Sequence, residues 1–214
     1  MTLTGSEVAS SEVTNRLRAG SPSVWLAEAH VRERRILVDL ELTFDDGPDP
    51  VWTPAVLDAL DAHRARGTFF VMGERAREHP EVVREVLGRG HAVQLHCHQH
   101  LRHTEVGREA IEADTARALA VLARLGVRPT RWRTPWGAQA AWTAEVAHGH
   151  GLELVGWDVD THDWRGDDAE AMLRAISPAL RPGAVVLMHD GLGPGSRRAD
   201  CEQTVRLTRL IAGG

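Results

Sequence analysis

The chain of 214 residues contains no lysine and no tyrosine, and it has only two cysteines, Cys97 and Cys201. Two cysteines cannot form the scaffold of a disulfide-stapled protein, so that class of small secreted fold is excluded. No apolar run reaches the length needed to cross a bilayer, and we expect no membrane partner. A formal net charge of -5 also gives no electrostatic reason to expect a nucleic-acid partner.

The start of the chain lacks the pattern of a secretory signal. Residues 1–11 are polar and acidic, with no basic segment followed by an apolar one, so the sequence predicts a cytoplasmic protein. The composition, 43% hydrophobic and 26% charged, is sufficient for a buried core. The length fits one compact domain, which we expect over residues 35–214. Residues 1–34, with a short helix near 12–18, are expected to form an arm packed on it. We expect a monomer or a weak homo-oligomer.

Apolar, β-branched runs alternate with helical patterns from residue 36 onward. The runs predict strands at 36–43, 68–72, 92–95, 152–157 and 184–188, with a further short strand at 131–133. Between them, Thr53 is expected to cap a helix that has Pro54 at its first position. Further helices are expected at 80–87, 104–125, 139–148, 167–180 and 201–211. This alternation predicts parallel βαβ units, arranged as a barrel or as an open doubly wound sheet.

Two adjacent aspartates, Asp45 and Asp46, follow the first predicted strand and precede Gly47-Pro48. Side chains alternate along a strand, so neighbouring carboxylates at its end are expected to do different jobs. Two close carboxylates also repel one another unless a cation or an arginine lies between them. The segment therefore predicts a metal ligand beside an acid/base group. The alternative is a simple turn, because aspartate, glycine and proline are all turn formers.

A cluster of histidines follows the strand predicted at 92–95. His96 and His100 are four residues apart, and in a helical turn this spacing would place both imidazoles on one side. Together with Asp46 they offer two nitrogens and one oxygen, which leaves positions open for water and substrate, as in a catalytic metal site. The alternatives are a solvated histidine-rich loop and a structural zinc site of Cys97 with His98 or His103.

Polar residues also follow three of the four remaining strands. Arg133 ends one of them and is suited to pair with a carboxylate. The segment 158–164 leaves another and combines acids with a tryptophan, and His189 ends the last, where it suits proton transfer near neutral pH. Taken alone, each has a simpler interpretation: a surface arginine at a turn, a polar loop whose tryptophan covers the core, and a structural histidine. Because the carboxyl ends of parallel strands face one crevice, we expect these groups to converge.

In order and spacing, these segments resemble the five motifs of the polysaccharide deacetylases of carbohydrate esterase family 4, the NodB-homology domain. The matching segments are 43–48, 96–100, 133–137, 160–164 and 187–189, and the resemblance covers about residues 36–212. It implies a distorted (β/α) barrel of about seven parallel strands. It also implies a divalent metal ion, Zn²⁺ first and Co²⁺ or another ion second, bound by Asp46, His96 and His100.

The resemblance further implies two proton-transfer pairs. Asp45 would be the general base that activates the attacking water, and Arg133 would orient it. His189 would be the general acid that protonates the departing amine, and Asp163 would hold and tune it. The backbone amide of Trp136 would stabilise the oxyanion of the tetrahedral intermediate, while Trp164 and Leu187 would form the hydrophobic wall of an acetyl pocket.

Two residues depart from the family pattern. Cys97 stands where the family has serine or threonine, and a thiol is a weaker hydrogen-bonding group. We therefore expect either a lower metal affinity or sensitivity to oxidation. Trp136 replaces a common tyrosine, and since its implied role belongs to the backbone, we expect a changed shape of the sugar site with little loss of activity.

The implied activity is hydrolytic N-deacetylation of an N-acetylated amino sugar with release of acetate. The partner would be an N-acetylglucosamine-type oligosaccharide, a polysaccharide or a sugar-bearing metabolite. One alternative is a hydrolase of another C–N bond, such as a formyl, imide or ureido group, because the same water-activating residues would serve it. The other is a catalytically silent saccharide-binding protein that keeps the fold.

Overall fold

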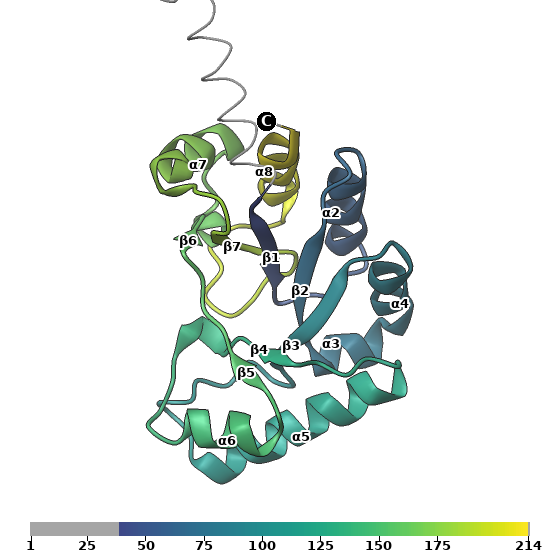
Figure 1. Cartoon of the computed structure of the whole chain (residues 1–214), viewed down its shortest axis with the longest axis vertical. Helices are drawn as coiled ribbons and strands as arrows, with labels where there is room; N and C mark the ends of the chain where they lie inside the picture. Colours follow the sequence, from purple (N-terminus) through teal and green to yellow (C-terminus); the bar gives the residue numbers. More distant parts are fainter. Residues whose placement is uncertain (1–38, 214) are drawn as a thin grey trace, which may run out of the picture.

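The computed structural model describes residues 39–213, in which seven parallel strands form one sheet in the order β5-β4-β3-β2-β1-β7-β6 (Figure 1). The strands are β1 (Glu41–Asp45), β2 (Gly67–Met72), β3 (Ala92–Cys97), β4 (Arg131–Trp132), β5 (Glu153–Leu154), β6 (Val159–Asp160) and β7 (Val185–His189). All seven are parallel, as the alternation of strands and helices predicts.

The sheet is curved into an incomplete barrel. Its two edges, β5 and β6, are consecutive in the chain and are joined only by residues 155–158. Laid flat, seven strands spaced about 4.8 Å apart would separate these edges by about 29 Å. The connection from Leu154 to Val159 spans at most about 18 Å when fully extended. The sheet must therefore curl back on itself, which is the distorted (β/α) barrel that the family resemblance implies.

Helices and short 3₁₀ turns connect the strands on the outside of the sheet (Figure 1). The helices are α2 (Trp52–Asp61), α3 (Gly73–Glu78), α4 (Pro80–Gly88), α5 (Arg108–Arg124), α6 (Thr143–Gly149), α7 (Ala169–Ile176) and α8 (Glu202–Gly213). The turns are η1 (Pro135–Gly137), η2 (Asp163–Arg165) and η3 (Ser177–Ala179). Helix α8 packs against both α2 and α7, so the end of the described chain covers β1 and β7.

The centre of the sheet is apolar on both sides. Every residue of β2 is buried, as expected for a parallel strand covered on both faces. Phe44 on β1 stacks on Phe69 on β2 with 5.0 Å between ring centroids. Leu95 on β3 and Met188 on β7 are also fully buried. The strands that carry the site residues are thus fixed by a packed core on both sides of β1.

Helix α2 begins differently from the prediction that Thr53 caps it. The N-cap residue is Val51, so Thr53 and Pro54 lie inside the first turn. The carboxylate of Asp49 accepts hydrogen bonds from the N–H groups of Val51 (2.8 Å) and Trp52 (2.9 Å), and therefore stabilises the start of the helix in place of Thr53. The hydroxyl of Thr53 instead accepts from the Asp49 N–H and donates to the buried carboxylate of Asp190.

Several strand boundaries also differ from the prediction. The strand expected at 36–43 begins at Glu41 within the described residues, and the one expected at 152–157 is reduced to Glu153–Leu154 because the chain then crosses to β6. The expected arm, residues 1–34, and the helix at 12–18 lie outside the described residues. Within residues 39–213, no helix combines the length and the apolar character that a bilayer-crossing segment requires.

Candidate active site

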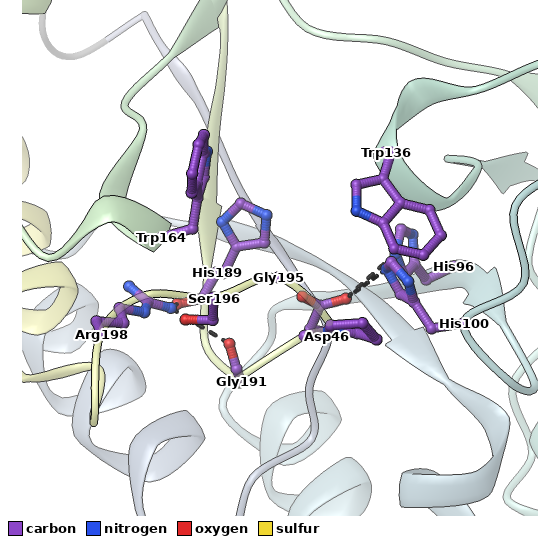
Figure 2. A pocket seen from close by; sticks show the side chains of 12 residues that line it. Asp46, His96, His100, Trp136, Trp164, His189, Gly191, Gly195, Ser196 and Arg198 are labelled. Atoms are coloured by element: carbon purple, nitrogen blue, oxygen red, sulfur yellow. Dashed lines mark hydrogen bonds and ion pairs between the residues drawn. The ribbon is translucent and has the colours of Figure 1, made fainter.

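The polar residues predicted at the strand ends gather at one rim of the sheet, around a cavity of about 200 Å³ (Figure 2). Asp45 ends β1, His96 lies near the end of β3, and His189 ends β7. Arg133 directly follows β4, and Asp163 begins the turn η2 after β6. The cavity is lined by Asp46, His96, His100, Trp136, Trp164, His189 and the glycine-rich loop that follows β7.

Three of these side chains form a group that fits a metal ion. The Oδ1 atom of Asp46 lies 3.3 Å from Nε2 of His96 and 3.2 Å from Nε2 of His100. One ligand atom from each residue lies within 4.8 Å of the others. Asp46 adopts a left-handed backbone conformation with φ of 71°, which turns the chain sharply where β1 ends. Both carboxylates of the Asp45-Asp46 pair consequently approach His96, at 3.9 Å and 3.3 Å.

The hydrogen bonding of His96 fixes which of its nitrogens faces the centre of this group. Its Nδ1–H donates to the carbonyl oxygen of Arg133 over 2.7 Å, so Nε2 presents a lone pair to Asp46. Oδ1 of Asp46 is buried and has no hydrogen-bond donor in the described structure. Facing lone pairs of this kind repel unless a cation lies between them, so this donor set fits a divalent ion such as Zn²⁺.

The route by which His96 and His100 meet differs from the predicted helical turn. His96 belongs to β3 and His100 lies in the irregular loop after it, so a reversal of the chain brings the imidazoles together. The carboxylate of Asp114 on α5 holds this loop, accepting from the N–H groups of His98 (2.7 Å) and Gln99 (2.9 Å).

Neither alternative reading of the histidine cluster fits this geometry. The side chains of His96 and His100 are only 2% and 7% exposed, which is inconsistent with a solvated loop. A structural zinc site on Cys97 is not formed either. Between residues 39 and 213, the three residues Asp46, His96 and His100 are the one group of suitable side chains close enough to share an ion.

Asp45 is held by the fully buried guanidinium of Arg133. One Arg133 nitrogen, NH1, donates to Oδ1 of Asp45 (2.9 Å) and to the hydroxyl of Thr43 (2.8 Å). The other, NH2, donates to the carbonyl oxygen of Gly156 (2.9 Å) in the segment that joins β5 and β6. Phe70 packs against the guanidinium, 4.2 Å from its central carbon to the ring centroid. A buried arginine with this many partners holds the Asp45 carboxylate in one direction.

His189 is hydrogen-bonded to Asp163 by both its imidazole and its backbone. Its Nδ1–H donates to Oδ1 of Asp163 (2.7 Å), and its backbone N–H donates to Oδ2 (2.9 Å). Burial would lower the pKa of His189, but Asp163, together with Asp46 and Asp45, raises it to about 9. Burial would likewise raise the pKa of Asp163, which the contacts with His189 and Arg198 hold below its usual range. The imidazole is therefore protonated near neutral pH.

Two tryptophans flank the cavity on opposite sides (Figure 2). Trp136 has a left-handed backbone with φ of 55°, is 41% exposed, and sets its ring against His100 with 4.1 Å between centroids. The guanidinium carbon of Arg102 lies over the same indole, 4.1 Å from the ring centroid. Trp164 forms the opposite side. Leu187, predicted as part of the acetyl pocket, is buried in β7 and is not among the lining residues.

Several buried polar residues around the site were not identified from the sequence. Arg198 and Thr204 both donate to Asp163, and Arg75 donates to the carbonyl oxygens of Asp46 (2.7 Å) and Leu192 (2.8 Å). These contacts join positions that are 29 to 117 residues apart along the chain. No spacing rule applies at such separations, so the sequence held no signal for them.

The environment of the two cysteines leads to a prediction about oxidation. Cys97 and Cys201 are both free and buried, and burial raises the pKa of both thiols. We therefore expect both thiols to react slowly with a disulfide reagent in the native protein. On denaturation, two thiols per chain should become reactive, as measured by thiol titration. Rapid modification of one thiol in the native protein would contradict this and would restore the predicted redox sensitivity of Cys97.

The sequence and the structure both match known proteins. A family model described as polysaccharide deacetylase matches residues 38–155. A chitooligosaccharide deacetylase from Bradyrhizobium sp. (strain ANU 289) is 38% identical over 173 residues, which is 77% of this chain and 76% of the relative. A peptidoglycan-N-acetylglucosamine deacetylase from Listeria monocytogenes is 36% identical over 71% of this chain and 32% of its own.

A solved structure is similar to this chain in fold as well as in sequence. The family 4 carbohydrate esterase from Streptomyces lividans, in complex with acetate, superposes with a TM-score of 0.73 at 32% identity, covering 81% of this chain and 85% of the other. The parallel half-barrel and the motif order thus agree with the matches by sequence. This chain belongs to the polysaccharide deacetylase family, as a NodB-homology domain of carbohydrate esterase family 4.

Proposed function

We propose that this protein is a metal-dependent N-deacetylase that hydrolyses the acetamido group of N-acetylated amino sugars to a free amine and acetate. The observation that carries the proposal is the convergence, around one cavity, of a metal-binding group and two separate proton-transfer pairs. The group is Asp46, His96 and His100, and the pairs are Asp45 with Arg133 and His189 with Asp163.

The three metal ligands would hold a divalent ion at the floor of the cavity, and Zn²⁺ suits two imidazole nitrogens and one carboxylate oxygen. When bound, such an ion polarises the acetyl carbonyl and makes a neighbouring water more acidic. Asp45 then accepts a proton from the attacking water while the water oxygen bonds to the carbonyl carbon. Arg133 keeps the carboxylate pointed at that position.

His189 completes the reaction from the other side. It lines the cavity, and its Nδ1–H is held by Asp163, so Nε2 is the atom that donates a proton to the sugar nitrogen. The C–N bond breaks as that proton arrives, and acetate and the amine separate. The backbone amide of Trp136 is proposed to donate to the developing oxyanion, a contribution on the order of 3 kcal/mol for such donors.

The relatives named above support an N-acetylglucosamine-containing saccharide as the substrate class. A cavity of about 200 Å³ admits an acetamido group and part of one sugar ring. The exposed indole of Trp136 and the half-buried indole of Trp164 offer faces on which sugar rings pack. The substrate would therefore extend out of the cavity between the two tryptophans.

The proposal is tested by measuring acetate release from N-acetylglucosamine oligomers, with formylated and imide substrates in parallel. We expect acetate from the acetylated sugars, loss of activity on chelation and recovery with Zn²⁺. Preferential turnover of the formyl or imide compounds would replace this substrate class by another C–N bond. Saccharide binding without any turnover would identify a catalytically silent protein.

A further inference from the structure

A buried arginine, Arg198, lies behind the His189–Asp163 pair in the loop between β7 and α8. Its side chain is 5% exposed, and Figure 2 shows it on the side of His189 away from Asp46 and His100. The guanidinium reaches five partners in three segments of the chain. It donates to Asp163 Oδ2 (2.8 Å), the carbonyl oxygens of His189 (2.9 Å) and Gly191 (3.2 Å), the sulfur of Cys201 (3.2 Å) and the hydroxyl of Thr204.

Asp163 has a donor on both oxygens because of this arrangement. Oδ1 accepts from the imidazole of His189, while Oδ2 accepts from the His189 N–H, the Thr204 hydroxyl (2.7 Å) and Arg198. A fully buried carboxylate with this many donors has a single low-energy orientation. Since Asp163 holds Nδ1 of His189, Arg198 and Thr204 indirectly fix the direction of the imidazole.

The charges around His189 give Arg198 a second effect. The groups that face the imidazole are Asp45 at the end of β1, Asp46 directly after it, Asp163 from η2 and, behind Asp163, Arg198. Of these four groups, Arg198 is the one cation. An arginine bound to Asp163 offsets part of the negative charge that retains the proton on His189. Without Arg198, the full negative charge of Asp163 would stabilise the protonated imidazole of His189.

We propose that Arg198 is a positioning residue for the proposed general acid. Acting through Asp163, it holds the imidazole of His189 in place. It also limits how tightly the negative charge of Asp163 retains the proton on that imidazole. This inference rests on the deacetylase function proposed above. Arg198 is also among the residues that line the cavity, but in this account it acts through Asp163 and not on a reacting atom.

The test compares two neutral variants with a charged one. In Arg198→Met and Arg198→Gln, His189 should bind its proton more tightly and become a weaker acid. The alkaline limb of the pH profile of kcat/KM should move up by about one pH unit, and the plateau should fall about tenfold. Arg198→Lys keeps the charge, so its limb should stay at the wild-type position. Should Arg198→Met not fold, Arg198→Gln carries the same prediction.

A matched control removes an arginine from the same region without touching Asp163. Arg206 lies on α8, is 56% exposed and pairs with Glu170, so Arg206→Met should leave both limb and plateau unchanged. The proposal is overturned if the limb of folded, zinc-loaded Arg198→Met or Arg198→Gln coincides with that of the wild type, whatever happens to the plateau. An equal shift in Arg198→Lys would also overturn it, because the charge would then be irrelevant.

A second readout separates this inference from the proposed function. NMR titration of the His189 imidazole in zinc-loaded protein reports proton binding directly and needs no turnover. If the wild type releases no acetate, the deacetylase assignment fails, but the NMR comparison still decides the role of Arg198. A titration midpoint that is higher in both neutral variants supports it, and equal midpoints reject it.

Discussion

Replacing Asp45 with asparagine should leave the metal site loaded and yet lower acetate release by about a thousandfold. Asparagine has the size of aspartate but cannot accept a proton from water at neutral pH. The three metal-ligating side chains are unchanged in Asp45→Asn, so we expect about one Zn²⁺ per chain, as in the wild type. The measurements are metal content after dialysis and the rate of acetate release.

The same variant has a predictable cost in stability. Arg133 would lose its counterion while fully buried and would retain only Thr43 and Gly156 as partners. We expect the free energy of unfolding to fall by about 1–3 kcal/mol. Asp58→Asn is the control, because Asp58 is 63% exposed and pairs with Arg89 at the surface. Near-normal turnover in Asp45→Asn would show that another group is the base.

Asp46→Ala should abolish acetate release by removing the metal ion. Asp46 is the residue that both His96 and His100 approach, and it supplies the oxygen of the donor set. We expect the affinity for Zn²⁺ to fall by about a hundredfold or more, measured by competition with a chelating dye. Activity should fall in parallel when protein is assayed without added metal.

Two further variants separate the loss of the ligand from general damage. Asp46→Asn keeps one oxygen and a residue type that tolerates the left-handed backbone, so its affinity should lie between those of Asp46→Ala and the wild type. His148→Ala removes an exposed histidine outside the cluster and should bind Zn²⁺ normally. Full activity of Asp46→Ala in the presence of chelator is the result that the metal-dependent mechanism does not survive.

Much of the fold follows from local patterns. Runs such as Phe69-Phe70-Val71 are apolar on both faces, so β2 and its neighbours were predictable as parallel buried strands. Helix α3 was not predicted, because the sequence from Gly73 to Glu78 is largely charged and lacks an apolar stripe. Strand β6 is two residues long, and only its pairing with β7, 27 residues further along the chain, identifies it.

The residues that face the cavity were largely predictable, whereas their supports were not. The expected groups at the ends of β1, β3 and β7 do meet, because parallel strands bring their carboxyl ends to one rim. The spacing of His96 and His100 was informative for a different reason from the one predicted, since a loop rather than a helical turn joins them. Arg198 and Asp114 act through contacts between distant segments, which no pattern in a single sequence records.

The position of Arg133 has a mechanical consequence. The barrel has a seam between β5 and β6, where residues 155–158 connect the two edge strands in place of an eighth strand. One guanidinium nitrogen of Arg133 donates a hydrogen bond to the carbonyl oxygen of Gly156 in that seam, and the other donates to Asp45. If this connection moved outward, it would displace Arg133 and with it the proposed base. We therefore expect residues 155–158 and the Asp45 carboxylate to move together.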